Sequence, residues 1–566
     1  MGKEKRKGVS RTRTLQKSAV KIPSATRVPS ALRASKSGPV RYGGETVPPG
    51  GADECDLVLV EDPDRLRRLL VQAGADPERD ISSKIVLPGR VRLVVAWFDA
   101  EAPASSSTRA AEHAASLRAD GERVRLRLDL VGAVHRQRIV LEVARNVHAS
   151  SFVGSRGVRR GEQPEPEEPL PPIVFYTAGS AAAGGELERL AGTVARAADL
   201  ENEPSNFLGP PELALAVRRW FEDDESPAVR ARVKVSVLDK RALERLGMGL
   251  VLGVGRGGEK PPCMILLECI GGRAPLGPPS RGRRRPLVAL VGKGVTYDAG
   301  GMAIKPGGSM YGMHGDKSGA AVAAAVMRHL VAGSETLPYD LVALLPAVEN
   351  LVSERAVRPG DVLTAYSGAT VEVVNPDAEG RLIMADAMAF AGDRYRPDVV
   401  VDFATLTGTS QSVHPDATAV FYAESDAVSA QVQAAGEATG ERVWRMPPWG
   451  EYAYHTDSPV ANARNDGWSS PAGGYMAAMF LRRFVPSSCG PAAWVHVDIG
   501  RNALDSASSA GPFVGAGVAL GVRIVEALGA GAAGGLKPSS SPPKIAGYKA
   551  HSTPLPATFE RSPSSH

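Results

Sequence analysis

Val291-Gly-Lys-Gly-Val-Thr-Tyr-Asp-Ala-Gly-Gly301 and Asn375-Pro-Asp-Ala-Glu-Gly-Arg381 are the two motifs around which this 566-residue chain is organised. The two motifs, together with Lys305 and Asp316 from the segment between them, supply seven charged side chains in apolar, glycine-rich surroundings. They are Lys293, Asp298, Lys305, Asp316, Asp377, Glu379 and Arg381. Burying a charge without a partner is costly, so the sequence predicts that these groups neutralise one another or bind ions.

The four carboxylates of this group favour a divalent metal site. Carboxylate oxygen is the ligand that hard divalent cations prefer, and the basic residues cannot neutralise four acids if one lysine is itself a ligand. Asp377 and Glu379 are two residues apart, so in an extended segment both can reach one metal pair. The glycines around Asp298 allow the backbone to approach a ligand closely. A structural ion-pair cluster is the alternative.

Both motifs resemble those of the leucine aminopeptidase family, two-metal exopeptidases that remove N-terminal residues. The resemblance covers about residues 200–525, includes Asn202-Glu-Pro-Ser-Asn206, and is weak over 55–200. It implies a metal-dependent aminopeptidase that hydrolyses the N-terminal peptide bond through a metal-bridging water. It also implies a preference for leucine or other apolar N-terminal residues and a role in peptide turnover.

The resemblance implies a ligand set for two divalent metal ions, Zn²⁺ or Mn²⁺. Asp298 and Glu379 would touch both metals, and Asp377 would complete the more exchangeable site. Lys293 and Asp316 would complete the tighter site. An amine ligand must be neutral, so Lys293 requires a strongly depressed pKa, which two adjacent dications would supply.

Further roles follow from the same resemblance. Lys305 would keep its charge and stabilise the developing oxyanion. Arg381 cannot act as a base and would hold a bicarbonate ion that shuttles the proton. Met313, Thr405 and Gly408 match positions near the substrate side-chain pocket, with ordinary core and turn residues as the alternative.

The hydrophobic pattern predicts an α/β fold. After residue 200 we expect strands at 233–238, 264–270, 287–291, 339–345, 371–374 and 398–404, and helices at 211–221, 240–246, 317–330 and 381–391. This alternation implies a catalytic domain with a mainly parallel central sheet flanked by helices. The charged residues follow strand ends, where open α/β sheets bind ligands, and Asp316 precedes a helix, where an anion is favoured.

Four parts are expected along the chain: a disordered basic arm over 1–50, an N-terminal α/β non-catalytic domain over 51–200, a C-terminal dinuclear-metal aminopeptidase domain over 201–528 and a disordered tail over 529–566. In the second part we expect strands at 56–60, 91–97 and 124–130 and helices at 110–118 and 187–200. Residues 271–285 read as an exposed basic insertion, and His496 and Asp498 as structural residues.

The first 50 residues carry twelve Lys and Arg against two Glu, about +10, which leaves about −5 for the rest of the chain. Such a composition is typical of a solvated tail; an organelle transit peptide and a contact with nucleic acid are the alternatives. We therefore expect a cytoplasmic protein, or a mitochondrial one if the arm is a transit peptide. No apolar run is long enough for a membrane span, so no membrane partner is expected.

The four cysteines are dispersed without metal-binding spacing and predict reduced thiols: Cys55, Cys263, Cys269 and Cys489. The resemblance implies a homohexamer that acts on peptide substrates. A nucleic-acid-binding protein that uses the basic arm, and a catalytically idle scaffold, are the rival hypotheses. Departures from the family pattern leave substrate preference and metal affinity open: Pro376, Lys317, Ser318 and Asn462.

Overall fold

The computed structural model describes residues 181–534, with gaps at 225, 272–284, 335, 414–417, 468–471 and 501–512, and a few short strands before them. The predicted helix at 110–118 lies outside the described residues. So do nearly all of the basic arm, most of the basic insertion and the chain after 534. Within the arm, β1 (Arg41–Tyr42) and β2 (Glu45–Thr46) form a small antiparallel pair.

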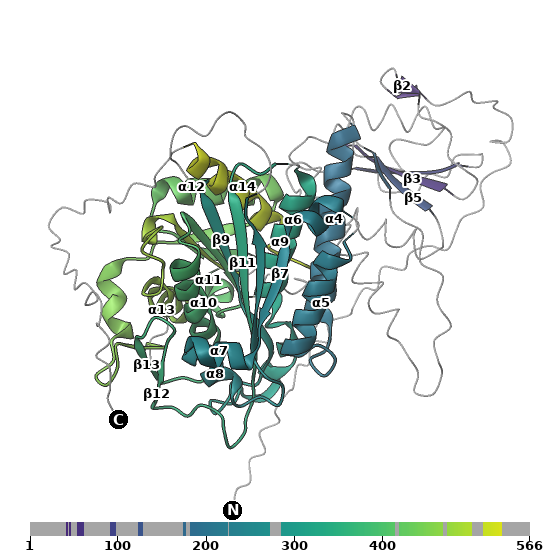
Figure 1. Cartoon of the computed structure of the whole chain (residues 1–566). Coiled ribbons are helices and arrows are strands. Elements are labelled where there is room, and N and C mark those ends of the chain that lie inside the picture. The colour runs from purple at the N-terminus through teal and green to yellow at the C-terminus, as the bar shows by residue number, and fades with distance from the viewer. Residues whose placement is uncertain are drawn as a thin grey trace, which may run out of the picture.

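Four parallel strands before residue 180 form a sheet in the order β4-β3-β5-β6 (Figure 1). They are β3 (Glu54–Val60), β4 (Val91–Trp97), β5 (Arg123–Arg127) and β6 (Val174–Tyr176). The three strands predicted in this part of the chain are confirmed, and residues 128–130 of the third lie outside the described residues.

A nine-stranded mixed sheet forms the centre of the molecule, in the order β16-β15-β18-β14-β9-β11-β8-β7, with β10 pairing with the end of β11. Its four central strands are mutually parallel: β9 (Leu287–Gly292), β11 (Asp340–Asn350), β14 (Val399–Ala404) and β18 (Trp494–Asp498). β10 (Gly294–Asp298) is parallel to β11. The remaining strands lie toward the edges: β7 (Lys234–Leu238), β8 (Cys263–Cys269), β15 (Ala419–Tyr422) and β16 (Val443–Met446). The predicted mainly parallel sheet is confirmed.

Helices cover both faces of this sheet (Figure 1). One face packs against α4 (Ala181–Asn202), α5 (Pro210–Glu222), α9 (Ser318–Gly333), α12 (Asp426–Thr439) and α14 (Val518–Ala533). The other face packs against α8 (Gly249–Gly255), α10 (Gly380–Arg394) and α13 (Gly473–Arg482). Along β9, Val288 and Leu290 join the first core, whereas Ala289 and Val291 join the second, as the two-residue period of a strand requires.

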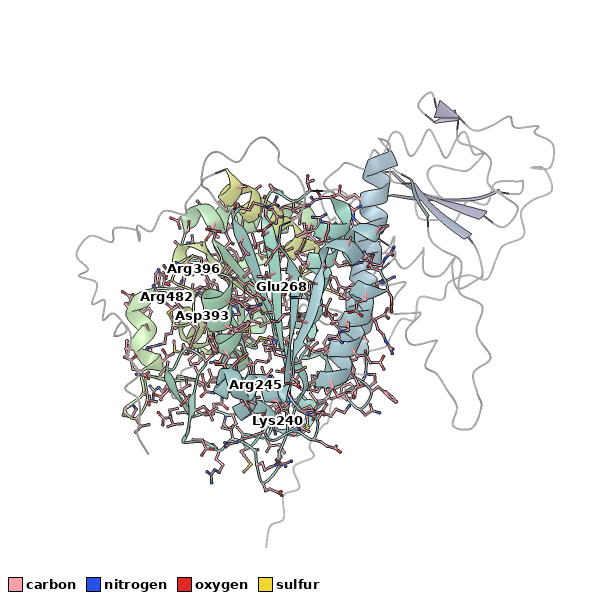
Figure 2. The ribbon with its side chains drawn as sticks, viewed as in Figure 1. Lys240, Arg245, Glu268, Asp393, Arg396 and Arg482 are labelled. Carbon is pink, nitrogen blue, oxygen red and sulfur yellow. The ribbon has the colours of Figure 1, made fainter. Side chains whose placement is uncertain are left out.

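Short elements connect these layers: α6 (Pro227–Arg232), α7 (Lys240–Leu246), α11 (Thr409–Val413), η2 (Gly307–Met310), η3 (Met313–Gly315), η4 (Gly450–Thr456) and η5 (Pro491–Ala493). The helix α7 illustrates how the sequence sets their ends. The Asp239 carboxylate accepts a hydrogen bond from the Ala242 N–H at 2.8 Å, and Gly247, at φ 71°, ends the helix. Lys240 and Arg245, labelled in Figure 2, are exposed on α7. None of the described helices is long and apolar enough to cross a membrane.

A second, three-stranded sheet supports one of the two motifs. It contains β12 (Asp361–Thr364), β13 (Thr370–Val373) and β17 (Ala463–Arg464), in that order. β12 and β13 are antiparallel, and β17 is parallel to β13. The loop that leaves β13 carries residues 375–379 and leads directly into α10, so this sheet and α10 together determine where the second motif lies.

Two helices cross the expected domain divisions. The expected division at 200/201 falls inside α4, and Leu190, Val194 and Ala197 on that helix pack into the core of the nine-stranded sheet. The tail was expected to begin at Gly529, but α14 continues to Ala533. The alanines in residues 529–533 favour a helix. Gly529 is buried against the Tyr339 ring, since a Cβ at this position would lie 2.3 Å from that ring.

The described cysteines agree with the prediction of reduced thiols. Cys263 and Cys269 are buried and Cys489 is half-buried, all three as free thiols. Burial raises the pKa of Cys263 to about 12, so this thiol is unreactive at neutral pH. The side chain of Cys55 lies outside the described residues.

Candidate metal centre

The charged residues of the two motifs meet at the carboxyl edge of the central parallel strands. Lys293 follows β9 and Asp298 is the last residue of β10. Asp316 lies two residues before α9, and Glu379 is the N-cap residue of α10. Carboxyl ends of neighbouring parallel strands lie at one edge of a sheet, which explains why residues so distant along the chain are brought together.

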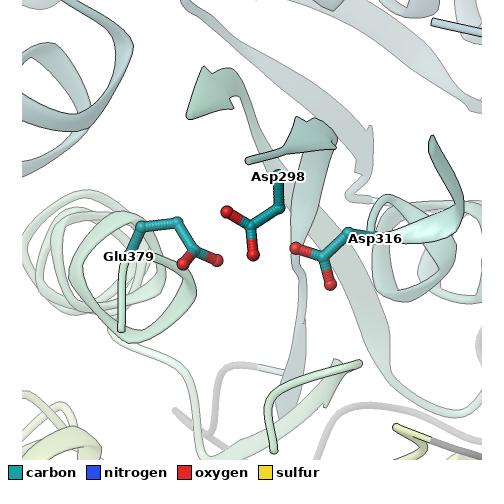
Figure 3. Close-up of side chains that lie close together, drawn as sticks. All are labelled: Asp298, Asp316 and Glu379. Atoms are coloured by element: carbon teal, nitrogen blue, oxygen red, sulfur yellow. The ribbon is translucent and has the colours of Figure 1, made fainter. Parts of the chain in front are cut away.

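Three carboxylates form the centre of the site. Asp298, Asp316 and Glu379 are buried, and one oxygen from each lies within 4.8 Å of the others. Figure 3 shows the three side chains pointing toward one another. Like charges at this separation in a buried position repel strongly, so the group requires cations between or beside its members.

Two lysines contact these carboxylates. The Lys293 ammonium lies 2.7 Å from Asp316 Oδ2 and 2.9 Å from Glu379 Oε1, and it donates a hydrogen bond to the Thr405 carbonyl at 3.0 Å. The Lys305 ammonium lies 2.7 Å from Asp298 Oδ2 and 2.6 Å from Asp377 Oδ1.

The four acids of the site therefore outnumber the two lysines that contact them. Burial and the neighbouring Asp298 charge raise the pKa of Glu379, and burial raises that of Asp316. Burial opposes the charge of Lys293, but Asp316 and Glu379 outweigh it and raise the pKa of this lysine. These pKa shifts arise from the protein side chains alone. A dication bound to the same carboxylates would instead lower the pKa of Lys293.

The residues present fit a divalent cation. Glu379 Oε2 is buried and has no hydrogen-bond partner among the residues that the structure describes. Asp316 Oδ2 and Asp377 Oδ1 contact the lysines only as ion pairs, without the geometry of a hydrogen bond. Buried carboxylate oxygens normally accept hydrogen bonds, and oxygens left free beside other carboxylates are suited to bind hard cations.

The position of Asp377 differs from that of the other three acids. Its side chain is 33% exposed, whereas that of Glu379 is 2% exposed. It is not part of the compact group of three and is joined to Asp298 through Lys305. The motif glycines keep this arrangement open: a Cβ on Gly300, at φ 84°, would lie 2.8 Å from Asp377 Oδ1, and one on Gly380 would lie 2.4 Å from Lys293 Cε.

Hydrogen bonds from distant residues hold the ligand loops, and the sequence reasoning missed these residues. Asn350, at the end of β11, donates to Asp298 Oδ1 at 2.8 Å and to the Pro376 carbonyl at 3.1 Å, so it joins the two motifs. Asn465 donates to the Asn375 and Ala378 carbonyls at 2.6 and 3.1 Å. The position of Asn350 at a strand end is a weak signal, and nothing in the sequence near Asn465 indicates its role.

The three residues predicted to line the substrate pocket lie in different surroundings. Thr405 donates a hydrogen bond to Asp316 Oδ1 at 2.6 Å and so touches the carboxylate cluster. Met313 is half-buried in η3, and Gly408 is exposed. The loop that follows Thr405 is anchored by Asp498, which accepts hydrogen bonds from the Leu406 N–H at 3.1 Å and from the Thr407 hydroxyl at 2.6 Å.

Arg381 lies behind the second motif rather than among the carboxylates. Its guanidinium is buried and contacts the Asn465 carbonyl and the Asp466 carboxylate. His496 is likewise buried away from the cluster: its Nδ1 pairs with Asp402 at 2.5 Å, which agrees with the structural role predicted for it.

The fold and the site together define a class: an α/β protein with a buried carboxylate and lysine cluster at the carboxyl edge of its central sheet, suited to divalent cations. The catalytic domain of the cytosol aminopeptidase family matches residues 195–525. The chain belongs to this family, and the family predicted from the two motifs is confirmed.

Several curated relatives are similar in sequence. A probable cytosol aminopeptidase of Syntrophotalea carbinolica is 41% identical over 370 residues, which cover 63% of this chain and 69% of the relative. One of Chelativorans is 40% identical over 324 residues, which cover 57% of this chain and 61% of the relative. The chain thus spans between 61% and 69% of the length of these two proteins.

Solved structures are similar over more of the chain. The bottromycin maturation enzyme BotP in complex with Mn is 26% identical, with a TM-score of 0.66 over 85% of this chain and 100% of that one. The cytosol aminopeptidase of Coxiella burnetii is 27% identical, with a TM-score of 0.63 over 84% of this chain and 97% of that one. A leucyl aminopeptidase from Leishmania major, 22% identical with a TM-score of 0.69 over 84% of this chain and 93% of that one, shares the fold.

Proposed function

We propose that this protein is a metal-dependent aminopeptidase, a hydrolase that removes N-terminal residues from peptides. The observation that carries the proposal is the buried group of Asp298, Asp316 and Glu379, with a Glu379 oxygen that accepts no hydrogen bond from any described residue. Family membership and the Mn complex of BotP support divalent metals as the occupants of this group.

Five residues would hold two ions, Zn²⁺ or Mn²⁺. Asp298 and Glu379 would contact both, Lys293 and Asp316 would complete the tighter site, and Asp377 the more exchangeable one. The greater exposure of Asp377 supports that last assignment. When bound, the ions would supply a water of lowered pKa and polarise the scissile carbonyl.

Lys305 and Arg381 would carry the remaining chemistry of the protein. The Lys305 ammonium is held between Asp298 and Asp377, which raise its pKa against the effect of burial, so it stays charged and can stabilise a developing oxyanion. Arg381 is the residue that would hold a bicarbonate ion. Its Nε atom is buried and has no hydrogen-bond partner among the described residues, which fits an anion.

Leucine or another apolar residue is the proposed N-terminal preference, with Met313, Thr405 and Gly408 near the substrate side chain. The contact of Thr405 with Asp316 supports its place beside the reacting bond. We also propose a homohexamer in the cytoplasm, or in mitochondria if the basic arm is a transit peptide. The proposed division of the chain follows the sequence, with α4 and residues 529–533 assigned to the catalytic domain.

The test uses purified protein with Zn²⁺ or Mn²⁺, a panel of N-terminal amino-acid amides, and metal analysis. Glu379→Ala and Lys305→Ala should each abolish hydrolysis of a leucine amide reporter, because one removes a ligand oxygen and the other the charge beside it. Unchanged turnover in either variant would refute the assignment. Salt-dependent nucleic-acid binding that disappears on deletion of residues 1–50 would instead support the rival hypothesis.

A further inference from the structure

A single carboxylate outside the metal cluster touches both ends of the second motif. Asp466 follows β17 and lies in the loop behind residues 375–381. Its Oδ1 lies 3.3 Å from Arg381 Nη1, and its Oδ2 accepts a hydrogen bond from Asn375 Nδ2 at 2.9 Å. The Gly467 N–H also donates to Oδ1 at 2.9 Å, which fixes the orientation of the carboxylate.

Arg381 needs such a partner because its guanidinium is buried, with only 5% of the side chain exposed. A buried cation without an anion is strongly destabilising. Within the described part of the chain, Asp466 is the carboxylate within ion-pair distance of Arg381. The neutral Asn465 carbonyl, at 3.0 Å from Nη1, completes the contacts of that nitrogen, while Nε has no partner.

The contact with Asn375 extends the influence of Asp466 to the metal ligands. Asn375 Oδ1 accepts a hydrogen bond from the Asp377 N–H at 3.0 Å, so Asp466 is linked through one side chain to the start of the ligand segment. The carboxylate is 23% exposed and is therefore not sealed from dissolved ions. One group thus determines the charge next to Arg381 and supports the backbone at Asp377.

We propose that Asp466 is a positioning residue that supplies, within the chain, the negative charge beside Arg381, and that it competes there with a dissolved anion such as bicarbonate. The inference rests on the proposed function, because it concerns the anion assigned to Arg381. The unaltered protein therefore binds bicarbonate weakly, since the guanidinium is already neutralised. Removal of the Asp466 charge exposes Arg381 to the dissolved anion.

The test compares Asp466→Asn with Asp457→Asn in the full-length protein. The first substitution keeps the size of the side chain and one oxygen for Asn375, and it replaces the charged oxygen beside Arg381 with a neutral amide nitrogen. Asp457 is a matched control: it also pairs with an arginine, Arg483, but its side chain is 62% exposed and lies in a different ion pair. Binding of ¹³C-labelled bicarbonate is measured by NMR and calorimetry, with and without Zn²⁺.

We expect Asp466→Asn to bind bicarbonate about tenfold more tightly than the unaltered chain, because removing a like charge beside the anion removes its repulsion. Asp457→Asn should match the unaltered chain. Leucine amide hydrolysis by Asp466→Asn should respond to bicarbonate at a correspondingly lower concentration. Equal affinities within about twofold, including no binding to either protein, would overturn the proposal.

The binding measurement does not depend on turnover, so it separates this inference from the proposed function. If the unaltered chain hydrolyses no N-terminal amide with Zn²⁺ or Mn²⁺, the aminopeptidase proposal fails, while the affinity comparison still decides the role of Asp466. If Asp466→Asn unfolds at the assay temperature, Asp466→Ser takes its place, and the same difference in affinity is required of it.

Discussion

Two groups of buried carboxylates lie in the same domain, and their charges are compensated differently. Asp402, on β14, accepts hydrogen bonds from Trp494 Nε1 at 2.7 Å and pairs with His496. Asp386, on α10, accepts three backbone hydrogen bonds, from Leu250, Val251 and Tyr366. Each of these acids receives its donors from the fold, and among the described residues neither belongs to a compact group of three possible metal ligands.

The acids of the metal centre have the opposite arrangement. Asp298, Asp316 and Glu379 lie beside one another, and Glu379 Oε2 has no donor within the described part of the chain. The two acids that support the fold receive donors from the fold, whereas the acids of the candidate metal centre lie beside one another and are left partly unsatisfied. This contrast can be tested with isosteric substitutions in the two groups, since each removes a charge with little change in volume.

The largest expected difference concerns activity. Asp298→Asn should lower kcat/KM for a leucine amide by about a thousandfold, because it removes a ligand oxygen from both proposed metal positions. Asp386→Asn, equally buried but outside the metal centre, should stay within about threefold of the unaltered enzyme. Steady-state kinetics at 25 °C measures kcat/KM for both variants. Similar losses of kcat/KM in the two variants would contradict the distinction between acids that support the fold and acids that bind metal.

The second prediction concerns metal-linked stability. At a free Zn²⁺ or Mn²⁺ concentration about 100 times the Kd, the unaltered protein should gain about 2.7 kcal/mol of unfolding free energy. Asp298→Asn should gain little, whereas Asp402→Asn should gain as much as the unaltered chain. Thermal unfolding with added metal, and again after chelation, measures this; an equal gain in all three proteins would count against the proposed ligands.

The third prediction concerns the acid that serves the fold. Asp402→Asn should lower the free energy of unfolding by about 2–3 kcal/mol, because an amide cannot accept from both Trp494 and a protonated His496 nitrogen, and one buried donor loses its partner. Denaturant unfolding of the metal-free proteins gives this value. A loss below about 0.5 kcal/mol would show that the buried pair is dispensable.

The fourth prediction is a pH dependence of stability. Burial raises the pKa of Asp386 to about 7, against the lowering effect of its backbone donors. Such a group binds its proton more tightly in the native state, so its contribution to stability is present below about pH 4 and is lost as the pH rises toward about 7. Asp386→Asn should therefore show a shallower decline in unfolding free energy across this window, measured by denaturant titration at several pH values. A slope unchanged by the substitution would exclude Asp386 as its source.

Much of the fold could be predicted because its signals are local. The buried strands that became β9 and β14 are short apolar runs, and the helices α5 and α10 begin within a residue or two of their predicted starts. The expected domain divisions depend on packing instead. α4 packs in the core around α9, and the sequence of the helix does not specify that partner.

The sequence by itself indicated which side chains to propose as metal ligands, because each of them lies at the end of a strand or shortly before a helix, in or between the two motifs. Only the tertiary structure decided what supports them. Asn350 reaches Asp298 from 52 residues away, and Asp466 reaches Asn375 from 91. A hydrogen bond or an ion pair requires its two groups within a few ångströms but places no constraint on their separation along the chain, so such partners appear only once the chain is folded.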